Sequence, residues 1–257
     1  MKVLVTGGTG ELGRAVVDRL LPAGHQVRVL SRTPRPHPRP EVDMWRGDLR
    51  DPDSVAASLA AVDTVVHCAS DVRSAAEVDV AGTATLLRAM HDLGVPHLVH
   101  VSIVGVDRVP IRYYRAKHEV ESLVGEDRVP WTLQRATQFH SFIDAMLART
   151  ARLPVIASPR GLRFQPVAVA DVADRLVAHV TAGPSGTAPD LGGPEVLSHA
   201  ELAHSWLRAH GSRRLLLPVP FPGQVGRAFR DGANLCPDRA STGETWQDHL
   251  RRAGAGG

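Results

Sequence analysis

The residue types best suited to acid–base chemistry lie near the middle of the chain, at Ser102, Tyr113 and Lys117. Tyr113 and Lys117 are four residues apart in a segment predicted to be helical, so their side chains share one face. A tyrosine hydroxyl can protonate the oxygen of a carbonyl undergoing reduction, but its pKa is ordinarily about 10. We expect the Lys117 ammonium to lower that pKa. Ser102 is expected to hydrogen-bond the carbonyl oxygen.

Lysine is rare in this chain, which draws further attention to Lys117. Of the 30 lysines and arginines, only Lys2 and Lys117 are lysine. The arginine bias is typical of a GC-rich genome, yet lysine can tune its pKa and arginine cannot. Tyr113 and Tyr114 are the two tyrosines of the chain, and the sequence leaves open which of them is the acid/base. A packed tyrosine pair beside a solvated lysine is the structural alternative.

A second set of residues has the spacing of a phosphate-binding loop. The segment Thr6–Gly13 reads TGGTGELG, follows a predicted strand and opens a predicted helix. Glycines at such positions permit a sharp turn, a close backbone approach to pyrophosphate and tight helix packing. The N–H groups of the helix N-terminus can then bind phosphate. The residues expected to bind a dinucleotide are Thr6, Gly7, Gly8, Thr9, Gly10, Glu11, Leu12 and Gly13, with the Glu11 side chain in solvent.

The end of the second predicted strand indicates which dinucleotide is bound. NAD-binding units usually carry an acid there, about 20 residues after the loop, to hold the ribose 2′-hydroxyl. Here Ser31 and Arg32 occupy the position, and no acid follows before Glu41. The guanidinium of Arg32 suits a 2′-phosphate. We therefore expect NADP(H) to be preferred over NAD(H), the alternative being that Arg32 lies there by chance.

Two later strand ends complete the expected cofactor site. Asp48 and Leu49 follow the third strand and are expected to contact adenine, while Cys68, Ala69 and Ser70 follow the fourth strand. Small side chains there let the backbone pass the cofactor. Cys68 has no suitably spaced partner for a metal, and we predict no metal site.

Strand-like and helix-like segments alternate over about the first 150 residues, which indicates an α/β fold with a doubly wound, Rossmann-type parallel sheet. The expected strands are Lys2–Thr6, Gln26–Leu30, Val42–Trp45, Thr64–Cys68, His97–Ser102 and Trp131–Arg135. The expected helices are Leu12–Leu21, Asp53–Leu59, Val78–Leu93, Tyr113–Val124 and Ser141–Arg149. A surface loop is expected at Thr33–Pro40.

The alternation weakens later in the chain. Strands are expected at Pro154–Ser158, Phe164–Val169 and Arg214–Val219, and helices at Ala170–Val180 and Ser198–His210. Residues 1–150 are thus predicted to form an NADP-binding Rossmann domain to which 165–182 return. Residues 151–236 would form a smaller substrate-side C-terminal region, with the substrate between it and the sheet edge. Residues 237–257 are expected to be a polar, frayed tail.

Composition excludes several classes of protein. A net charge of +3 over 257 residues does not indicate a nucleic-acid surface. No apolar run is long enough to span a membrane, and the N-terminus lacks the pattern of a signal peptide. The two cysteines are far apart in sequence, so a reducing cytoplasm is the expected compartment. The expected partner is a small-molecule substrate, with no nucleic acid or membrane, in a monomer or homodimer.

With these residues in view, the chain resembles the short-chain dehydrogenase/reductase superfamily, and more narrowly its atypical, NmrA-like, NAD(P)H-binding branch. The resemblance covers about residues 1–180. It rests on the segments Thr6–Gly13, Ser31–Arg32, Gly47–Leu49, Asp79–Thr83, Val101–Gly105, Tyr113–Glu121, Trp131–His140 and Gln165–Ala173.

The resemblance implies NADP(H) at the carboxyl edge of the sheet, with Lys117 also holding a ribose hydroxyl. Ser102, Tyr113 and Lys117 match the superfamily's Ser, Tyr and Lys, whereas its Asn has no obvious match here. Gln138, Phe139 and His140 are expected at the nicotinamide and substrate end, although His140 can equally be a structural histidine. The branch also includes members without the Tyr that act as redox sensors.

The leading hypothesis is an NADP(H)-dependent oxidoreductase that transfers hydride between the cofactor and a small organic substrate. Tyr113 would be the acid/base, Lys117 would tune it and Ser102 would orient the substrate oxygen. One alternative is a non-catalytic, NADP(H)-sensing regulatory protein. Another is a nucleotide-sugar epimerase- or dehydratase-like enzyme that recycles its cofactor.

Overall fold

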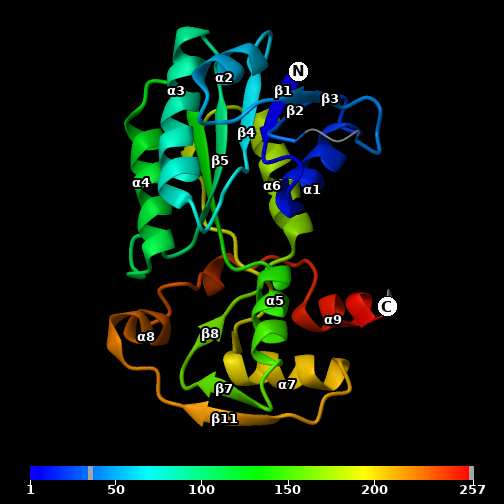
Figure 1. Cartoon of the computed structure of the whole chain (residues 1–257), viewed down its shortest axis with the longest axis vertical. Helices are drawn as coiled ribbons and strands as arrows, with labels where there is room; N and C mark the ends of the chain where they lie inside the picture. Colours follow the sequence, from blue (N-terminus) through cyan, green and yellow to red (C-terminus); the bar gives the residue numbers. More distant parts are fainter. Residues whose placement is uncertain (34–36, 255–257) are drawn as a thin grey trace. The chain divides into compact units, whose positions relative to one another are not determined.

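The computed structural model of the chain describes residues 1–33 and 37–254 (Figure 1). Residues 34–36 of the expected surface loop and the last residues of the expected tail, 255–257, lie outside the described part. The described residues form two compact units. Unit 1 comprises the described residues within 1–102, 112–134 and 172–189, and unit 2 comprises residues 103–111, 135–171 and 190–254.

The main sheet of the described residues has seven strands in the order β3-β2-β1-β4-β5-β6-β9. Strand β1 is an interior strand, third in this order, and pairs in parallel with β2 and with β4. This is the strand order of a Rossmann fold, extended by one short strand, so the predicted fold class is confirmed. The strands are β1 (Lys2–Thr6), β2 (Gln26–Ser31), β3 (Asp43–Arg46), β4 (Thr64–His67), β5 (Leu98–Ile103), β6 (Trp131–Ala136) and β9 (Gly186–Thr187).

Apolar side chains on both faces of the sheet explain why helices cover it. On one face, a continuous core joins sheet residues such as Leu4 and Val65 to Leu86 and Val120 of the helices. That face carries α2 (Pro52–Ser58), α3 (Gly82–Asp92) and α4 (Arg112–Glu126), with the π-helix η1 (Ala76–Ala81) running directly into α3. In Figure 1, α1 (Glu11–Leu20) and α6 (Val169–Ala182) lie side by side, and an ion pair between Arg19 and Asp174 joins them.

Unit 2 is built from shorter elements. Its described residues include a parallel pair of strands, β7 and β11, and an antiparallel pair, β8 and β10. Helix α7 begins with a capping box, in which Ser198 and Glu201 satisfy each other's backbone N–H groups. The elements are α5 (His140–Thr150), β7 (Val155–Pro159), β8 (Arg163–Phe164), β10 (Leu197–Ser198), α7 (His199–Ala209), β11 (Leu215–Val219), α8 (Gly223–Arg230), η2 (Pro237–Arg239) and α9 (Trp246–Gly254).

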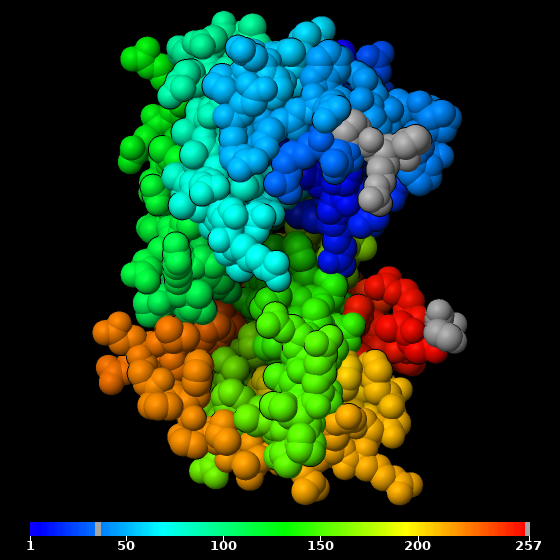
Figure 2. All heavy atoms as spheres, viewed as in Figure 1, coloured from blue at the N-terminus to red at the C-terminus, as the bar shows by residue number. Residues whose placement is uncertain are grey.

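The C-terminal segment differs from the expectation of a frayed polar tail. Residues Trp246–Gly254 form helix α9, whose Trp246 and Leu250 are four residues apart and both buried. The Trp246 indole donates a hydrogen bond to Ser205 Oγ on α7 at 2.9 Å, and the two helices lie next to one another in Figure 2 (red and yellow). Two apolar side chains in a polar segment were too weak a pattern to predict this packing.

The other differences concern short elements. Strand β9 has two residues and joins the main sheet by pairing in parallel with β6. Two residues are too few to show the alternation of side chains that predicts a strand from sequence. The strand expected at Phe164–Val169 is limited to Arg163–Phe164, and α8 was not expected. No helix of the described residues has both the length and the apolar character needed to cross a membrane.

The core on the α2–α4 face yields a test of the packing. Leu86 is fully buried, whereas Leu93, at the end of the same helix, is 53% exposed. We expect Leu86→Ala to lower the free energy of unfolding by about 2–5 kcal/mol. The control Leu93→Ala should change it by less than about 0.5 kcal/mol. Urea unfolding followed by tryptophan fluorescence measures both, because Trp45 and Trp131 pack against this core; equal effects would contradict the assignment.

Candidate functional site

A pocket of about 230 Å³ lies in unit 1 where several strands of the main sheet end. Thr6, Ser31 and His67 are the last residues of β1, β2 and β4, and parallel pairing brings these ends to one edge of the sheet. In doubly wound folds, ligands bind at this carboxyl edge. The pocket is lined by Thr6, Gly7, Thr9, Gly10, Leu30, Ser31, Arg32, Gly47, Asp48, Leu49, Cys68, Ala69, Ser70, Asp71 and Val78.

The glycine loop leaves no room for side chains at two positions. Gly7 has a φ of +68°, and a Cβ there would lie 2.6 Å from the backbone nitrogen of Ala69. A Cβ on Gly13 would lie 2.2 Å from the carbonyl oxygen of Gly7, because α1 packs directly against the turn. The turn is closed by the N–H of Gly10, which donates to the Gly7 carbonyl at 2.9 Å. This cradle is of the kind that a pyrophosphate group needs.

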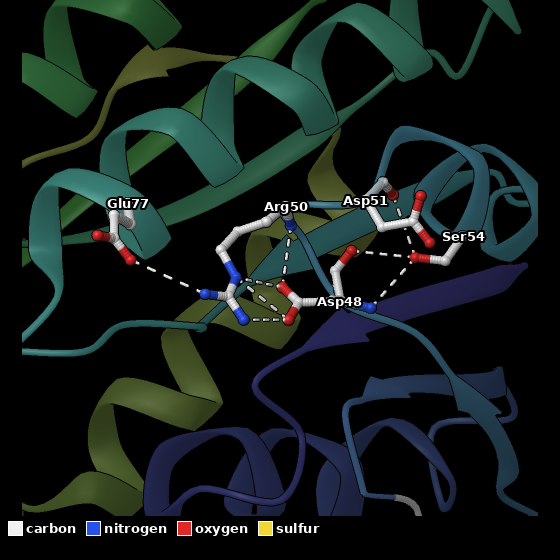
Figure 3. A network of polar contacts seen from close by, with 5 residues as sticks. All are labelled: Asp48, Arg50, Asp51, Ser54 and Glu77. Atoms are coloured by element: carbon white, nitrogen blue, oxygen red, sulfur yellow. Dashed lines mark hydrogen bonds and ion pairs between the residues drawn. The ribbon is translucent and has the colours of Figure 1, made fainter.

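A polar network holds the loop after β3 at one side of the pocket (Figure 3). Arg50 donates two kinds of hydrogen bond to the Asp48 carboxylate. Its Nη2 lies 2.7 Å from Oδ2, and its backbone N–H donates to Oδ1 at 3.0 Å. The Ser54 hydroxyl donates toward the carbonyls of Asp48 and Asp51, while its oxygen accepts the Asp48 N–H. Arg50 also lies 3.8 Å from a Glu77 oxygen. Asp48 is therefore held in place beside the pocket.

The charges beside the pocket favour an anionic ligand group near Arg32. The hydrogen bond from Arg50 is the main reason that the pKa of Asp48 falls to about 2, and Arg32 adds a smaller attraction. Asp48 is thus ionised at neutral pH, and its charge is largely neutralised by Arg50. Arg32 is exposed and makes no hydrogen bond or ion pair with another described residue. Its guanidinium remains available for a ligand.

A hydrogen-bonded chain links the pocket to the helix of the predicted acid/base. The Ser70 hydroxyl donates to Asp79 Oδ1 at 2.6 Å, and its oxygen lies 2.6 Å from the Tyr113 hydroxyl. Because a serine hydroxyl has a single proton, Tyr113 must be the donor to Ser70 in this arrangement. On the other side, the Lys117 ammonium lies 3.6 Å from Asp79 Oδ1, with both side chains almost fully buried. Tyr113 and Lys117 thus meet through Ser70 and Asp79.

The acidity of Tyr113 differs from the sequence-based expectation. Burial raises its pKa to about 12, and the Asp79 charge adds to that rise, while the hydrogen bond with Ser70 opposes it. The pKa of Lys117 is lowered, mainly by burial, although Asp79 works against the change. Lys117 is not among the groups that shift the pKa of Tyr113 in this arrangement, since its ammonium faces Asp79, and its expected effect on Tyr113 stays a prediction. Tyr113 is a neutral phenol across the physiological pH range.

Neutral side chains surround the buried lysine. The His67 ring bonds to the hydroxyls of Thr6 and Thr83, and it stacks on His100 with ring centres 5.2 Å apart. Burial lowers the pKa of His67 to about 3 and raises that of the Cys68 thiol to about 12. These groups are therefore uncharged at neutral pH. Cys68 lacks the thiolate that a nucleophile requires.

The structure does not place all predicted site residues around the pocket. Five predicted cofactor residues do not line the pocket: Gly8, Glu11, Leu12, Gly13 and Lys117. The side chain of Glu11 is exposed, as expected, whereas Lys117 is buried. Ser102 is buried in β5, and its Oγ has no hydrogen-bond partner among the described residues. Its role in orienting a substrate oxygen stays a prediction.

The residues predicted for the substrate end belong to unit 2, not to the unit that forms this pocket. Gln138 and His140 are buried there, and Phe139 precedes α5. Neither side-chain polar atom of Gln138 reaches a hydrogen-bond partner among the described residues. Contact of these residues with a substrate stays a prediction.

Asp79 is the main site residue that sequence analysis did not single out for a role. It is 1% exposed, and it accepts from the Asp71 N–H at 3.0 Å as well as from Ser70. Asp79 lies in the π-helical turn η1, which is a local irregularity often found at functional sites. A carboxylate within an apolar helical segment was the signal available in the sequence.

Comparison with known proteins now adds to this geometry. The model of the NAD(P)H-binding family matches residues 7–182. The (4-alkanoyl-5-oxo-2,5-dihydrofuran-3-yl)methyl phosphate reductase of Streptomyces griseus is 30% identical over 90% of this chain and 86% of its own length. The 2-alkyl-3-oxoalkanoate reductase of Stenotrophomonas maltophilia is 37% identical over 51% of this chain and 40% of its own length. An uncharacterized protein of Mycobacterium tuberculosis is 29% identical over 91% of this chain, which spans only 26% of that protein.

Solved structures share the fold at low sequence identity. A nucleoside-diphosphate-sugar epimerase from Staphylococcus aureus has a TM-score of 0.81 at 16% identity, over 98% of this chain and all of that chain. An NADPH-dependent quinone oxidoreductase from Escherichia coli has a TM-score of 0.79 at 16% identity, over 98% of this chain and 99% of that chain. At such identities the likeness concerns the fold alone.

The buried pair of Asp79 and Lys117 yields a test of the hydrogen-bonded chain. Asp79→Asn leaves the Lys117 ammonium buried without a counter-charge, and we expect a loss of about 3–5 kcal/mol in the free energy of unfolding. The double variant Asp79→Asn/Lys117→Met should recover a large part of that loss, because it removes the unpaired charge. The exposed acid Asp92, changed to Asn, is the control. The single variant Lys117→Met completes the cycle, and urea unfolding measures the wild type and the four variants. Additive effects of the Asp79 and Lys117 substitutions would contradict the pairing.

Proposed function

Because the chain belongs to the NAD(P)H-binding family, we propose that it is an NADP(H)-dependent oxidoreductase of the atypical short-chain dehydrogenase/reductase type. It would reduce a small organic carbonyl or conjugated compound. The observation that carries the proposal is the continuity between the glycine-lined pocket and the Tyr113 hydroxyl, which both contact Ser70. A cofactor bound in the pocket and a proton donor would then meet at the same place.

The residues of the pocket fit the cofactor. The tight turn at Gly7 and Gly10 suits the close approach of a pyrophosphate, and the N-terminus of α1 offers N–H groups to it. Asp48 is an ionised acceptor suited to the exocyclic amine of adenine, next to the apolar Leu49. Arg32 and Ser31 are suited to a 2′-phosphate. This set supports NADP(H) as the preferred dinucleotide.

The bound nicotinamide would supply the hydride. Tyr113, with a pKa of about 12, would donate its proton to the substrate oxygen as negative charge develops there. The Ser70 hydroxyl, which donates to Asp79 in this arrangement, would turn to give its proton to the Tyr113 phenolate, and Lys117 would resupply Ser70 through Asp79. Lys117 is the charged proton source at the far end of the chain. Because reduction of a carbonyl consumes a proton at its oxygen, the protonated state of Tyr113 supports reaction in the reducing direction.

The relatives suggest which compounds to test first. One is named for the reduction of a 2-alkyl-3-oxoalkanoate and another for that of an alkanoyl-oxo-dihydrofuran methyl phosphate. Both names describe a carbonyl compound with an alkyl chain. We propose a substrate of this class, and turnover of NADPH with a panel of 3-oxo acids, acyl lactones and quinones is the direct test.

One observation favours a second function, that of an NADP(H) sensor without turnover. The Lys117 ammonium faces Asp79, and nothing in this arrangement lowers the pKa of Tyr113 below its usual value. A sensor would bind NADPH with wild-type affinity yet oxidise it with no compound of the panel. It would also capture a protein partner in a manner that depends on the redox state of the cofactor.

The preference for NADP(H) can be tested at Arg32. Loss of a charge-assisted hydrogen bond to a phosphate corresponds to about 1.5–3 kcal/mol. We therefore expect Arg32→Ser to weaken NADPH binding by roughly tenfold to a hundredfold and to leave NADH binding nearly unchanged. Calorimetry measures both affinities. Arg88→Ser, an exposed arginine of α3, is the control. Tighter binding of NADH than of NADPH by the wild-type protein would contradict the assignment.

The role of Tyr113 can be separated from that of its neighbour. Tyr113→Phe should lower kcat by roughly a hundredfold or more, as expected for loss of a general acid, while NADPH affinity stays close to wild type. Tyr114 is buried and serves as the matched control, since Tyr114→Phe should retain most of the activity. Steady-state kinetics with the best substrate of the panel measures the effect. The opposite ranking of the two variants would transfer the role to Tyr114.

A further inference from the structure

A second group of chemically active side chains lies in unit 2, independent of the proposed function. His140 at the start of α5, Glu244 just before α9 and His249 within α9 come together although about a hundred residues separate the first from the others. One donor atom from each of the three lies within 4.8 Å of the other two. His140 Nδ1 is 3.9 Å from Glu244 Oε2, and the two imidazole rings are centred 5.1 Å apart.

His140 is the residue whose environment is unusual. It is 2% exposed, and neither ring nitrogen reaches hydrogen-bond geometry with a described group. Buried polar atoms are almost always hydrogen-bonded, so a buried imidazole in this state calls for an explanation. A ring nitrogen of His140 bound to a metal ion would no longer be an unsatisfied buried atom.

The surrounding packing holds two of the three side chains in place. Trp246 is fully buried, donates to Ser205, and stacks on the His249 ring at 5.4 Å with planes 20° apart. The same indole lies 6.0 Å from the His140 ring. The stacking on Trp246 thus fixes the His249 ring of α9 beside His140 at the N-terminus of α5.

The charged neighbours set the electrostatics of the cluster. Glu244 is the nearest carboxylate, and Arg252 pairs with it at 3.1 Å from the solvent side. Asp248 is held by Thr245 and Arg251, so it adds negative charge without entering the cluster. Arg252 has a side chain that is 69% exposed and can move away. The Arg252 guanidinium therefore competes with a metal ion for the Glu244 carboxylate.

We propose that His140, Glu244 and His249 form a binding site for a divalent transition-metal ion of the Zn²⁺ class. Two imidazoles and one carboxylate are a ligand set that zinc uses when a fourth position is left to water. Donors bound at about 2.1 Å in a tetrahedral site are roughly 3.4 Å apart, so the side chains need only small rotations to close on an ion. The ion would satisfy the buried ring of His140 and join the C-terminal helix to α5.

Metal binding can be measured directly on the full-length protein without an affinity tag. After treatment with a chelator, the wild-type chain should bind one equivalent of Zn²⁺ in a calorimetric titration, and its Tm should rise with added Zn²⁺. Co²⁺ in the same site should give the visible absorption of a four-coordinate ion. Each of these readouts is separate from enzymatic activity.

Matched variants assign the binding to the cluster. His249→Gln and Glu244→Gln leave the buried His140 in place and should weaken Zn²⁺ binding at least tenfold, whereas the exposed His204 of α7, changed to Gln, should bind as wild type does. Arg252→Gln should retain or tighten binding, because it frees Glu244. The absence of one equivalent of bound metal, or unchanged affinity in both cluster variants, would overturn the proposal. Loss of Zn²⁺ binding in Arg252→Gln would also overturn the proposal, because removing the guanidinium that pairs with Glu244 should leave that carboxylate free to bind the metal ion.

Discussion

The interior position of β1, with a parallel partner on each side, is the constraint on which the rest of unit 1 depends. Backbone hydrogen bonds register Thr6 against Leu30 of β2 and against His67 of β4. The ends of these strands must then meet at one edge. The glycine turn, Ser31 and the small residues after β4 converge there for that reason, and the pocket follows from the pairing. A glycine turn that lets the backbone approach closely and a helix N-terminus with free N–H groups both lie at this edge, and together they suit an anionic ligand.

The second determinant of the site is the burial of Lys117. An ammonium cannot remain in the interior without a counter-charge, and Asp79 provides one at 3.6 Å. Asp79 in turn accepts from Ser70, which fixes the direction of the hydrogen bond from Tyr113. The result is a phenol with a raised pKa beside the glycine-lined pocket. The neighbouring His67 and Cys68 remain neutral because burial opposes their charged forms.

Much of the fold and of the glycine-lined pocket could be predicted because the patterns that specify them are local. The glycine spacing, the missing acid after β2 and the alternation of strands and helices each lie within about thirty residues of sequence. The spacing of Tyr113 and Lys117 correctly predicted a helix, but it did not predict the charge that Lys117 faces. Asp79 comes from an irregular helical turn more than thirty residues earlier, and its partners are set by how η1 packs against α4. The direction of the pKa change at Tyr113 followed from that packing.

By itself, the sequence determined the class of fold, the place of the glycine loop and the family, because each is encoded by neighbouring residues with a fixed spacing. Only the tertiary structure decided which side chains meet: Ser70 with Tyr113, Lys117 with Asp79, and His140 with Glu244 and His249. These contacts join segments that are far apart in the chain, so no periodicity relates them. They depend on how buried surfaces pack, and packing also determines which polar groups lose water and which partners compensate that loss.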